Sequence, residues 1–463
     1  MAAPNCWRCL ARPSQRLLAP TSTSSSLAVP VTTATFSTSA RLAKKEGGGL
    51  SSHVRTGKKL VLGRKKKQDP GKPVLPGERK AFRKRIQLSN DNALEVPGLA
   101  QVTAATLVDP AAAGKIVGLP DALIDQLRTV EAFKPTQNWG LFRSPHMLVR
   151  QETVDLIKDM TDKVQKKQTV RTVITGERGS GKSILGLQVL SAGLLNKWVV
   201  INIPEAQELS TAHTDYSPIP KSEMFSHPTY ILKLMQAIYS ANKDILSKLQ
   251  VGLEHIHLPF SVPRSMSLAA LANATKEPDF AWPTFHALWQ ELLLPGRPPI
   301  MFNLDGLSHM MRVSDYRNPA FELIHCHDLA LLRLFADALG GKTQFPNGAA
   351  ITGVMTKGNC PKLPSVDMAL EQAAAAQAGT EIPARDPFYR KYDDRVFDAL
   401  KGVSVFNVKG VSKPEARALM EYWAASGVLR MRVDEKNVSE KWTLAGSGVL
   451  GEMERASLYV VRL

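Results

Sequence analysis

The chain has 463 residues, of which 44% are hydrophobic and 22% charged, as in an ordinary globular protein of about three domains. No run approaches the ~18 consecutive apolar residues of a transmembrane helix, so we predict no membrane span. The net charge of +17 is uneven: residues 1–90 contain 19 basic and three acidic side chains, and the rest of the chain contains 40 and 39. The N-terminal end therefore indicates a targeting signal, a contact with a polyanion, or both.

Residues 1–40 are rich in Ser, Thr and Ala, and they include Arg8, Arg12 and Arg16 but no acidic residue. This composition is typical of a mitochondrial transit peptide, whereas a secretory signal would need a continuous apolar segment. An unstructured tail is the alternative interpretation. The composition therefore predicts a protein of the mitochondrial matrix.

Residues 41–90 contain 16 basic and three acidic residues, a net charge of +13, and few large apolar side chains. We expect this arm to be disordered in the free chain. Its charge would neutralise phosphates along an RNA surface, and a solvated tail is the alternative. The predicted RNA contacts are the two densest basic runs, Arg64, Lys65, Lys66, Lys67 and Arg83, Lys84, Arg85.

Residues 91–168 show short helical patterns, and from there the chain changes to strands that alternate with helices. The β-branched run 169–175 precedes a glycine-rich loop, a helical segment 183–197 follows it, and 198–203 is the next expected strand. Strands alternating with helices predict an α/β fold with a parallel sheet that is covered by helices on both faces. We assign this core to residues 169–367.

Two further segments follow the predicted core. Residues 368–385 are Ala-rich with little side-chain bulk, and we expect a linker or an insertion there. Residues 386–463 are expected to form a smaller, mostly helical C-terminal domain. Its clearest helix begins at Ser412, because Glu415 three residues later completes a capping box, and it ends at Gly427.

The strongest local pattern is "GERGSGKS" at 176–183, which has the spacing G-x-x-x-x-G-K-S of a phosphate-binding loop (P-loop). Glycines let backbone N–H groups approach phosphate oxygens, and the following helix directs its positive dipole end toward them. The lysine supplies a charge to the β- and γ-phosphates, and the serine supplies a hydroxyl to Mg²⁺. A glycine-rich turn with a coincidental lysine is the alternative. The predicted nucleotide-binding residues are Gly176, Glu177, Arg178, Gly179, Ser180, Gly181, Lys182 and Ser183.

A second metal ligand is expected at the end of a buried strand, and Asp305 in "IMFNLD" has that position. The predicted Mg²⁺ ligands are thus Ser183 and Asp305. Many nucleotide hydrolases have a Glu directly after this Asp, as the base for the attacking water, but here the residue is Gly306. General-base catalysis contributes ~10²–10⁴-fold in rate, so we expect binding with slow or no hydrolysis.

The identity of the base is less well indicated. The segment "TKGN" resembles a guanine-reading [NT]-K-x-D motif, but it ends in Asn359 in place of the carboxylate. The other interpretation is that Thr352 or Thr356 lies at a strand end and contacts the γ-phosphate or the base. Trp139 and Phe142, before the loop, could line a base pocket, although such residues are more often part of the core.

Together these motifs resemble one family, the death-associated protein 3 or mitochondrial small-ribosomal-subunit protein 29 family, from about residue 119 to the end. The resemblance depends on "TGERGSGKS", "WVVINIPEAQEL", "TDYSP", the acid-lacking "FNLDGL", "YRNPAFELIHCHDLALLRLF", "DPFYRKYDDRV", "EARALMEYWAASGVLR" and "GEMERA". A P-loop alone occurs in many unrelated proteins. The Asp305–Gly306 pair and the C-terminal segments narrow the resemblance to this family.

The resemblance implies a core similar to that of AAA-type ATPases with a helical lid, and a place in the mitoribosomal small subunit near its intersubunit side. It also implies a bound purine nucleotide with Mg²⁺, with GTP or GDP favoured and ATP as the alternative. Small-subunit rRNA and other small-subunit proteins are the implied partners. We expect a structural ribosomal protein with little or no nucleotide turnover. The alternatives are an active NTPase that acts as a switch in ribosome assembly, and an adaptor in apoptosis signalling.

Overall fold

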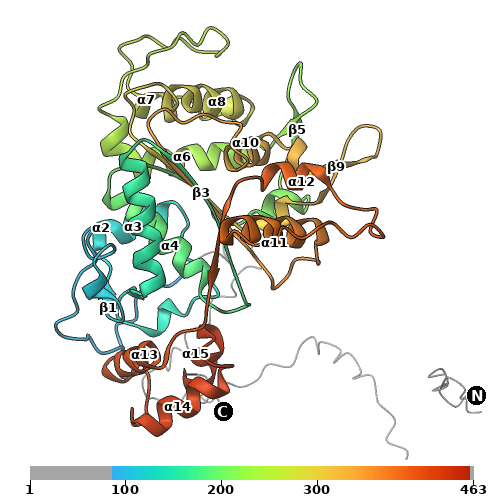
Figure 1. Ribbon diagram of the computed structural model, residues 1–463. Coiled ribbons are helices and arrows are strands. Elements are labelled where there is room, and N and C mark those ends of the chain that lie inside the picture. Colours follow the sequence, from blue (N-terminus) through green and yellow to red (C-terminus); the bar gives the residue numbers. More distant parts are fainter. Residues whose placement is uncertain (1–85, 459–463) are drawn as a thin grey trace, which may run out of the picture. The chain divides into compact units, whose positions relative to one another are not determined.

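The computed structural model describes residues 86–458. The predicted transit peptide and the seven basic residues assigned to RNA binding lie outside the described residues. Within the described part, no helix is long and apolar enough to cross a membrane. The described chain forms an α/β fold around a five-stranded parallel sheet with helices on both faces, as expected from the alternation of strands and helices (Figure 1).

The central sheet consists of β3 (Thr169–Gly176), β4 (Val199–Ile203), β7 (Ile300–Asp305), β10 (Ala349–Val354) and β11 (Ser404–Val408). The strand order is β11-β3-β10-β7-β4, and every neighbouring pair is parallel. Val354 pairs with Ile174 on one side and Asp305 on the other. The strands that precede the glycine loop and that end in Asp305 therefore reach the same edge of the sheet, one strand apart.

Side chains of the strands alternate between two hydrophobic cores, as in Val173 and its neighbour Ile174. One core lies under the helices on the left of the sheet in Figure 1, α2 (Asp121–Thr129), α3 (Gln151–Gln165) and α4 (Lys182–Leu195). The other lies under α6 (Pro228–Leu246), α7 (Leu268–Ala272), α8 (Ala281–Leu292), α10 (Ala330–Leu339), α11 (Pro364–Ala378) and α12 (Asp394–Ala399). Both sheet faces are thus covered.

Two predicted boundaries are wrong. The expected linker at 368–385 is largely helix α11, which buries Val366, Ala369 and Leu370 against the core. Alanine has the highest helix propensity, so an Ala-rich segment with little side-chain bulk is compatible with a helix and does not by itself indicate a linker. The C-terminal helical domain also starts later than 386, because β11 is an edge strand of the central sheet.

The C-terminal helices are α13 (Lys413–Ala425), α14 (Glu435–Leu444) and α15 (Leu450–Leu458), and they gather at the lower end of Figure 1. The predicted capping box of Ser412 and Glu415 is confirmed. Gly427 follows the helix with φ 75°, in the left-handed region. Met420, Trp423 and Met453 form the centre of a separate small core. We call α13–α15 the C-terminal helices.

The remaining elements are short. The segment 91–168 contains a two-stranded antiparallel sheet that the sequence did not predict, because three-residue strands are too short to show a period. These elements are η1 (Pro110–Ala112), β1 (Ile116–Gly118), η2 (Trp139–Leu141), β2 (His146–Leu148), α5 (Gln207–Ser210), β5 (Ser217–Pro218), β6 (Phe225–Ser226), η3 (Pro278–Phe280), α9 (Leu307–Met310), β8 (Val313–Arg317), β9 (Leu323–His325) and η4 (Cys326–Asp328).

Candidate nucleotide-binding site

The glycine-rich loop joins β3 to α4 at the carboxyl edge of the sheet. Gly176, Gly179 and Gly181 have φ values of 148°, 79° and 97°, where other residues are strained. At Gly176 a Cβ atom would also lie 2.7 Å from the carbonyl oxygen of Val408 on β11. These three glycines are therefore required by the path of the backbone, independently of any ligand.

Lys182 begins α4 and is only 8% exposed. Its ammonium group donates hydrogen bonds to the carbonyl oxygen of Gly176, at 3.1 Å, and to that of Glu177. Burial, reinforced by the nearby Lys357, lowers the pKa of Lys182 to about 8, against the opposing effect of Asp305 and Glu177. The loop thus holds a buried cation that has only neutral carbonyl oxygens as hydrogen-bond partners.

Asp305 ends β7, all six residues of which are buried. Its carboxylate forms an ion pair with Lys134. Lys134, Asp305 and Ser183 line one small cavity, so the structure brings the two predicted Mg²⁺ ligands to a common space. Lys134 was missed by the sequence analysis, because a lone lysine in "AFKPTQ" belongs to no motif and only the fold brings it to Asp305.

A cavity of about 1150 Å³ opens beside the loop, which is large enough for a nucleotide. Its lining combines the glycine loop, Asp305, the segment 133–139 and the start of α15. Trp139 and Phe142 are 5% and 3% exposed, so they belong to the core and also contribute to the wall.

The C-terminal helices close one side of this cavity. The backbone N–H of Gly451 donates to the carbonyl oxygen of Gly179 at 2.9 Å. One turn further along α15, Glu454 Oε2 accepts a hydrogen bond from Asn138 Nδ2 at 2.9 Å. Burial raises the pKa of Glu454, although Asn138 and Arg455 oppose the shift. Neither Asn138 nor Glu454 was singled out in the sequence, because they are 316 residues apart and meet only in the fold.

The two predicted threonines differ in position. Thr352 is completely buried in β10 and lies outside the residues that line the cavity. Thr356 lines the cavity, and its carbonyl oxygen accepts a hydrogen bond from Ser308 Oγ at 2.8 Å. Asn359 donates to Gln207 Oε1 at 2.6 Å, so its amide is used within the protein. We therefore keep Thr356 as a candidate contact and leave out Thr352.

Gly306 has φ 85°, which explains why a glycine follows Asp305. The neighbouring strand supplies a carboxylate that the sequence analysis did not consider. Glu205 follows β4, is exposed and lines the cavity, and the next residue, Ala206, donates its N–H to the carbonyl oxygen of Asp305 at 2.9 Å. A carboxylate is therefore available beside Gly306 from another strand.

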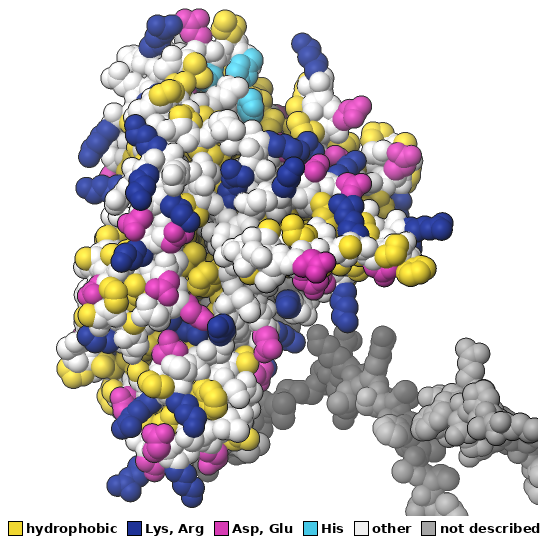
Figure 2. Space-filling view, in the orientation of Figure 1, with side chains coloured by type: hydrophobic (Ala, Val, Ile, Leu, Met, Phe, Trp, Pro, Cys, Tyr) yellow, Lys and Arg dark blue, Asp and Glu magenta, His cyan; other side chains and the backbone are white. Residues whose placement is uncertain are grey.

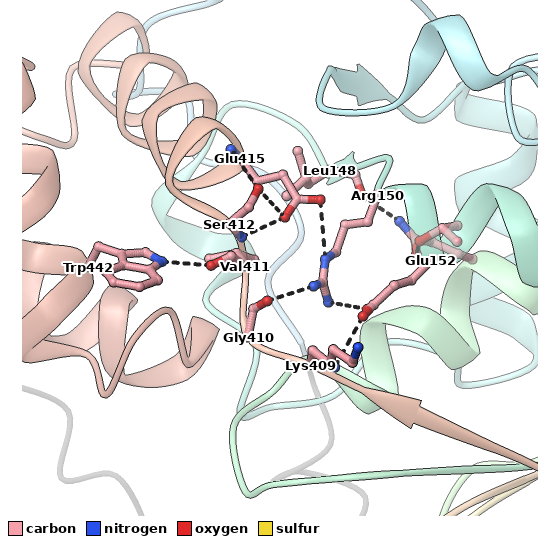
Figure 3. Close-up of polar contacts among 11 residues, drawn as sticks. Leu148, Arg150, Glu152, Lys409, Gly410, Val411, Ser412, Glu415 and Trp442 are labelled. Atoms are coloured by element: carbon pink, nitrogen blue, oxygen red, sulfur yellow. Dashed lines mark hydrogen bonds and ion pairs between the residues drawn. The ribbon is translucent and has the colours of Figure 1, made fainter.

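Arg150 anchors the C-terminal helices to the core (Figure 3). Its guanidinium donates to the carbonyl oxygen of Gly410 at 3.0 Å and forms ion pairs with Glu152 at 3.0 Å and Glu415 at 3.6 Å. Glu415 is also the capping residue of α13, so one guanidinium binds the connection between β11 and α13 and the start of that helix. We call Arg150, Glu152, Gly410 and Glu415 the Arg150 cluster.

Outside the cavity, the described surface mixes both signs of charge. On the face drawn in Figure 2, basic and acidic side chains are interspersed over most elements. This agrees with the near-equal count of the two types beyond residue 90. The basic character of the chain therefore comes from its N-terminal residues.

Comparison with known proteins adds what the geometry alone cannot give. The family profile "Mitochondrial ribosomal death-associated protein 3" matches residues 147–456. The chain belongs to this family. A Neurospora crassa protein, "Small ribosomal subunit protein mS29", is 51% identical, and the alignment covers the whole of both chains. A Schizosaccharomyces pombe protein of the same title is 22% identical over 72% of this chain and 69% of its own.

Membership of the mitochondrial ribosomal death-associated protein 3 family confirms the resemblance predicted from the motifs and the mitochondrial location. The matched range 147–456 contains the glycine loop, Asp305 and Glu454. Lys134 and Asn138 precede it, although the alignment with the Neurospora crassa relative includes them. The cavity is thus built from residues inside the family match together with a segment that lies before it.

Proposed function

We propose that this member of the family is a structural constituent of the mitoribosomal small subunit that binds a purine nucleotide with Mg²⁺ and turns it over slowly or not at all. The ribosomal part is supported by family membership and by the titles of both relatives. The nucleotide part depends mainly on one observation. Lys182, Ser183 and Asp305 all line one cavity of about 1150 Å³.

Asp305 and Ser183 offer a carboxylate and a hydroxyl, the hard oxygen ligands that Mg²⁺ prefers, although Lys134 already pairs with the Asp305 carboxylate. When bound between Ser183 and Asp305, the ion would neutralise phosphate charge. The protein's own contribution would be the loop N–H groups and Lys182. In this proposal the core is AAA-like, and the C-terminal helices act as a lid, since Gly451 is hydrogen-bonded to Gly179 of the loop.

The base is proposed to lie against Asn138 and Glu454. A carboxylate accepts hydrogen bonds from the N1–H and N2–H groups of guanine, whereas adenine offers no such pair of donors. Asn138 already donates to one oxygen of Glu454, which holds the carboxylate in place. The geometry therefore favours GTP or GDP over ATP.

Glu454→Gln is expected to lower the preference for GDP over ADP by about tenfold, the effect of one charge-assisted hydrogen bond. The measurement is competition of the two nucleotides against a fluorescent analogue. Glu440→Gln on α14 is the matched control, because Glu440 is exposed and does not line the cavity. An unchanged preference in Glu454→Gln would show that the base is read elsewhere.

The nucleotide proposal is tested by denaturing the purified full chain and identifying what is released by ion-exchange chromatography. We expect stoichiometric purine nucleotide, and a rise in melting temperature when GDP is added to stripped protein. A chain that contains no nucleotide and is not stabilised by millimolar GTP, GDP, ATP or ADP would contradict the proposal.

An active NTPase is the second candidate, and the position of Glu205 on the cavity wall favours it. The rate of phosphate release from purified protein distinguishes an active NTPase from a structural protein with slow or no turnover. Lys182→Ala gives the background rate. We expect the wild-type rate to stay far below ~1 s⁻¹, the lower end of ordinary enzymes. A wild-type rate of that size that is lost in Glu205→Gln would identify an NTPase with Glu205 as the residue that orients water. Gly306→Glu is a poorer test, because the φ of 85° disfavours any side chain there.

Nucleotide affinity should depend on pH through Lys182. Its pKa of about 8 lies below the ordinary value of 10.5 because burial disfavours the charged form, so the free site loses its cation as pH rises past 8. Nucleotide phosphates bind the protonated form. We therefore expect constant affinity between pH 6.5 and 7.5 and a loss of about tenfold per unit above pH 8, measured by fluorescence titration. A flat profile up to pH 9.5 would contradict this assignment.

The basic arm is proposed to contact small-subunit rRNA, on the basis of its charge alone. Deleting residues 41–85 should weaken binding of the chain to small subunits most at low salt and should flatten the salt dependence, because counterion release is lost. Binding that responds to salt identically with and without the arm would show that the arm is a passive tail.

A further inference from the structure

Asp305, the proposed Mg²⁺ ligand, already has a cationic partner in the protein. Its carboxylate is only 8% exposed, and Lys134, at 25%, forms an ion pair with it. Lys134 also lines the small cavity shared with Ser183. The Lys134 ammonium thus contacts the carboxylate that a metal ion held by Asp305 and Ser183 would need.

We propose that Lys134 is a resident counter-cation that takes the place of Mg²⁺ beside Asp305, so that a bound nucleotide depends little on divalent metal. This inference rests on the proposed nucleotide function. A lysine ammonium has three hydrogen-bond donors, and one bond to Asp305 leaves two that can reach phosphate oxygens. Charge-assisted hydrogen bonds of this kind are stronger than those between neutral groups. They would link the Asp305 carboxylate to the phosphates as a metal ion does.

A ladder of buried amides fixes one end of the segment that carries Lys134. Asn303 on β7 donates to Asn202 Oδ1 on β4 at 2.7 Å, and Asn202 donates to the carbonyl oxygen of Val130 at 2.7 Å. Asn202 and Asn303 are 4% and 3% exposed. Since Asp305 lies on the same strand as Asn303, the sheet itself sets the distance between the carboxylate and the segment of Lys134.

The other end of the segment is held by Gln137. Its Oε1 accepts from the backbone N–H of Lys134 at 2.8 Å and from Trp139 Nε1 at 2.7 Å. Phe133 packs edge-to-face on Trp139, with ring centroids 5.4 Å apart. The backbone around Lys134 is therefore fixed before any ligand arrives, and a cation that is preorganised in this way costs little ordering entropy on binding.

The small cavity also limits how many cations can share the position. Its volume is about 10 Å³, and a space of that size holds about one water molecule. Mg²⁺ and the ammonium would repel each other there, and Lys182 adds a further positive charge nearby. In the small cavity Mg²⁺ and Lys134 therefore compete for the Asp305 carboxylate, so a metal ion bound there would add little net positive charge.

The test measures how fast nucleotide leaves the full chain. Wild type, Lys134→Met and Lys233→Met are loaded with a fluorescent GDP analogue and chased with unlabelled GDP, in Mg²⁺ or in EDTA. Lys233 is the matched control, because it pairs with Glu131 on the same segment but does not line the cavity. We expect chelation to change release from wild type and Lys233→Met by less than about threefold, and from Lys134→Met by roughly 10- to 100-fold, the effect of one charge-assisted contact.

Two results would overturn the inference: strong acceleration of wild-type release by EDTA, or insensitivity of both wild type and Lys134→Met. Failure to load any nucleotide in Mg²⁺ would instead contradict the proposed function. If Lys134→Met does not fold, because Asp305 is left unpaired, the double variant Lys134→Met/Asp305→Asn removes both charges. It should release nucleotide faster than wild type does in EDTA, and an equal rate would show that Lys134 contributes nothing.

Discussion

Replacing Lys182 with alanine is expected to abolish nucleotide retention and to lower the melting temperature of the full chain by roughly 5 °C. Loss of a ligand present at ~1,000 times its Kd removes about 4 kcal/mol of stability. A folded body of about 370 residues has an unfolding entropy of roughly 0.8 kcal/mol/K, so this free energy corresponds to the stated shift. The measurements are nucleotide content after denaturation and a thermal melt with and without GDP.

The reason lies in the position of the ammonium group. Lys182 is buried and is held by the carbonyl oxygens of Gly176 and Glu177, so its charge is fixed at the loop and alanine removes it. Lys158→Ala on α3 is the matched control, because Lys158 is exposed on the outer side of that helix. If Lys182→Ala kept its nucleotide, or if nucleotide-free wild type melted at the temperature of the bound form, the nucleotide would not be a stabilising ligand.

The parts of the site that could be predicted from the sequence are those encoded by neighbouring residues. The glycine loop can be predicted because strand, loop and helix signals follow one another within residues 169–197, and the strand ending in Asp305 can be predicted from its own apolar run. The capping box is likewise a local pattern, because Glu415 lies three residues after Ser412, and the structure confirms it. Short-range spacing therefore predicts the core, the glycine loop of the candidate site and the first of the C-terminal helices.

The rest of the site depends on contacts that no local pattern records. Lys134 meets Asp305, and Asn138 meets Glu454, only because the segment before β2 and the last helix both pack on the carboxyl edge of the sheet. The edge strand β11 was assigned to the helical domain, since "SVFNV" lacks the continuous apolar character of a buried strand, and the structure leaves it only partly buried. Its pairing with β3 is a tertiary effect that overrides a weak local signal.

Arg150→Met is expected to destabilise the chain by about 3 kcal/mol, as when one partner of a buried ion pair is removed. The substitution leaves the Gly410 carbonyl, Glu152 and Glu415 without their shared cation. The side chains of Arg150 and Glu415 are 12% and 14% exposed, so water can replace the lost contacts only in part. Urea unfolding measures the change, and Arg417→Met, which removes an exposed pair with Glu421, is the control expected to stay within about 0.5 kcal/mol.

Loss of the Arg150 side chain should also affect the cavity. The Arg150 cluster holds the chain just before the C-terminal helices, and the start of α15 lines the cavity. We therefore expect Arg150→Met to release nucleotide faster than wild type, and trypsin to cut sooner near Arg430 and Arg432, between α13 and α14. Lys182→Ala should also lose its nucleotide. If Arg150 holds the C-terminal helices, trypsin should not cut this variant early between α13 and α14. If the nucleotide holds them, early cleavage should occur there. The comparison shows whether the ion pairs or the ligand keep the C-terminal helices on the core.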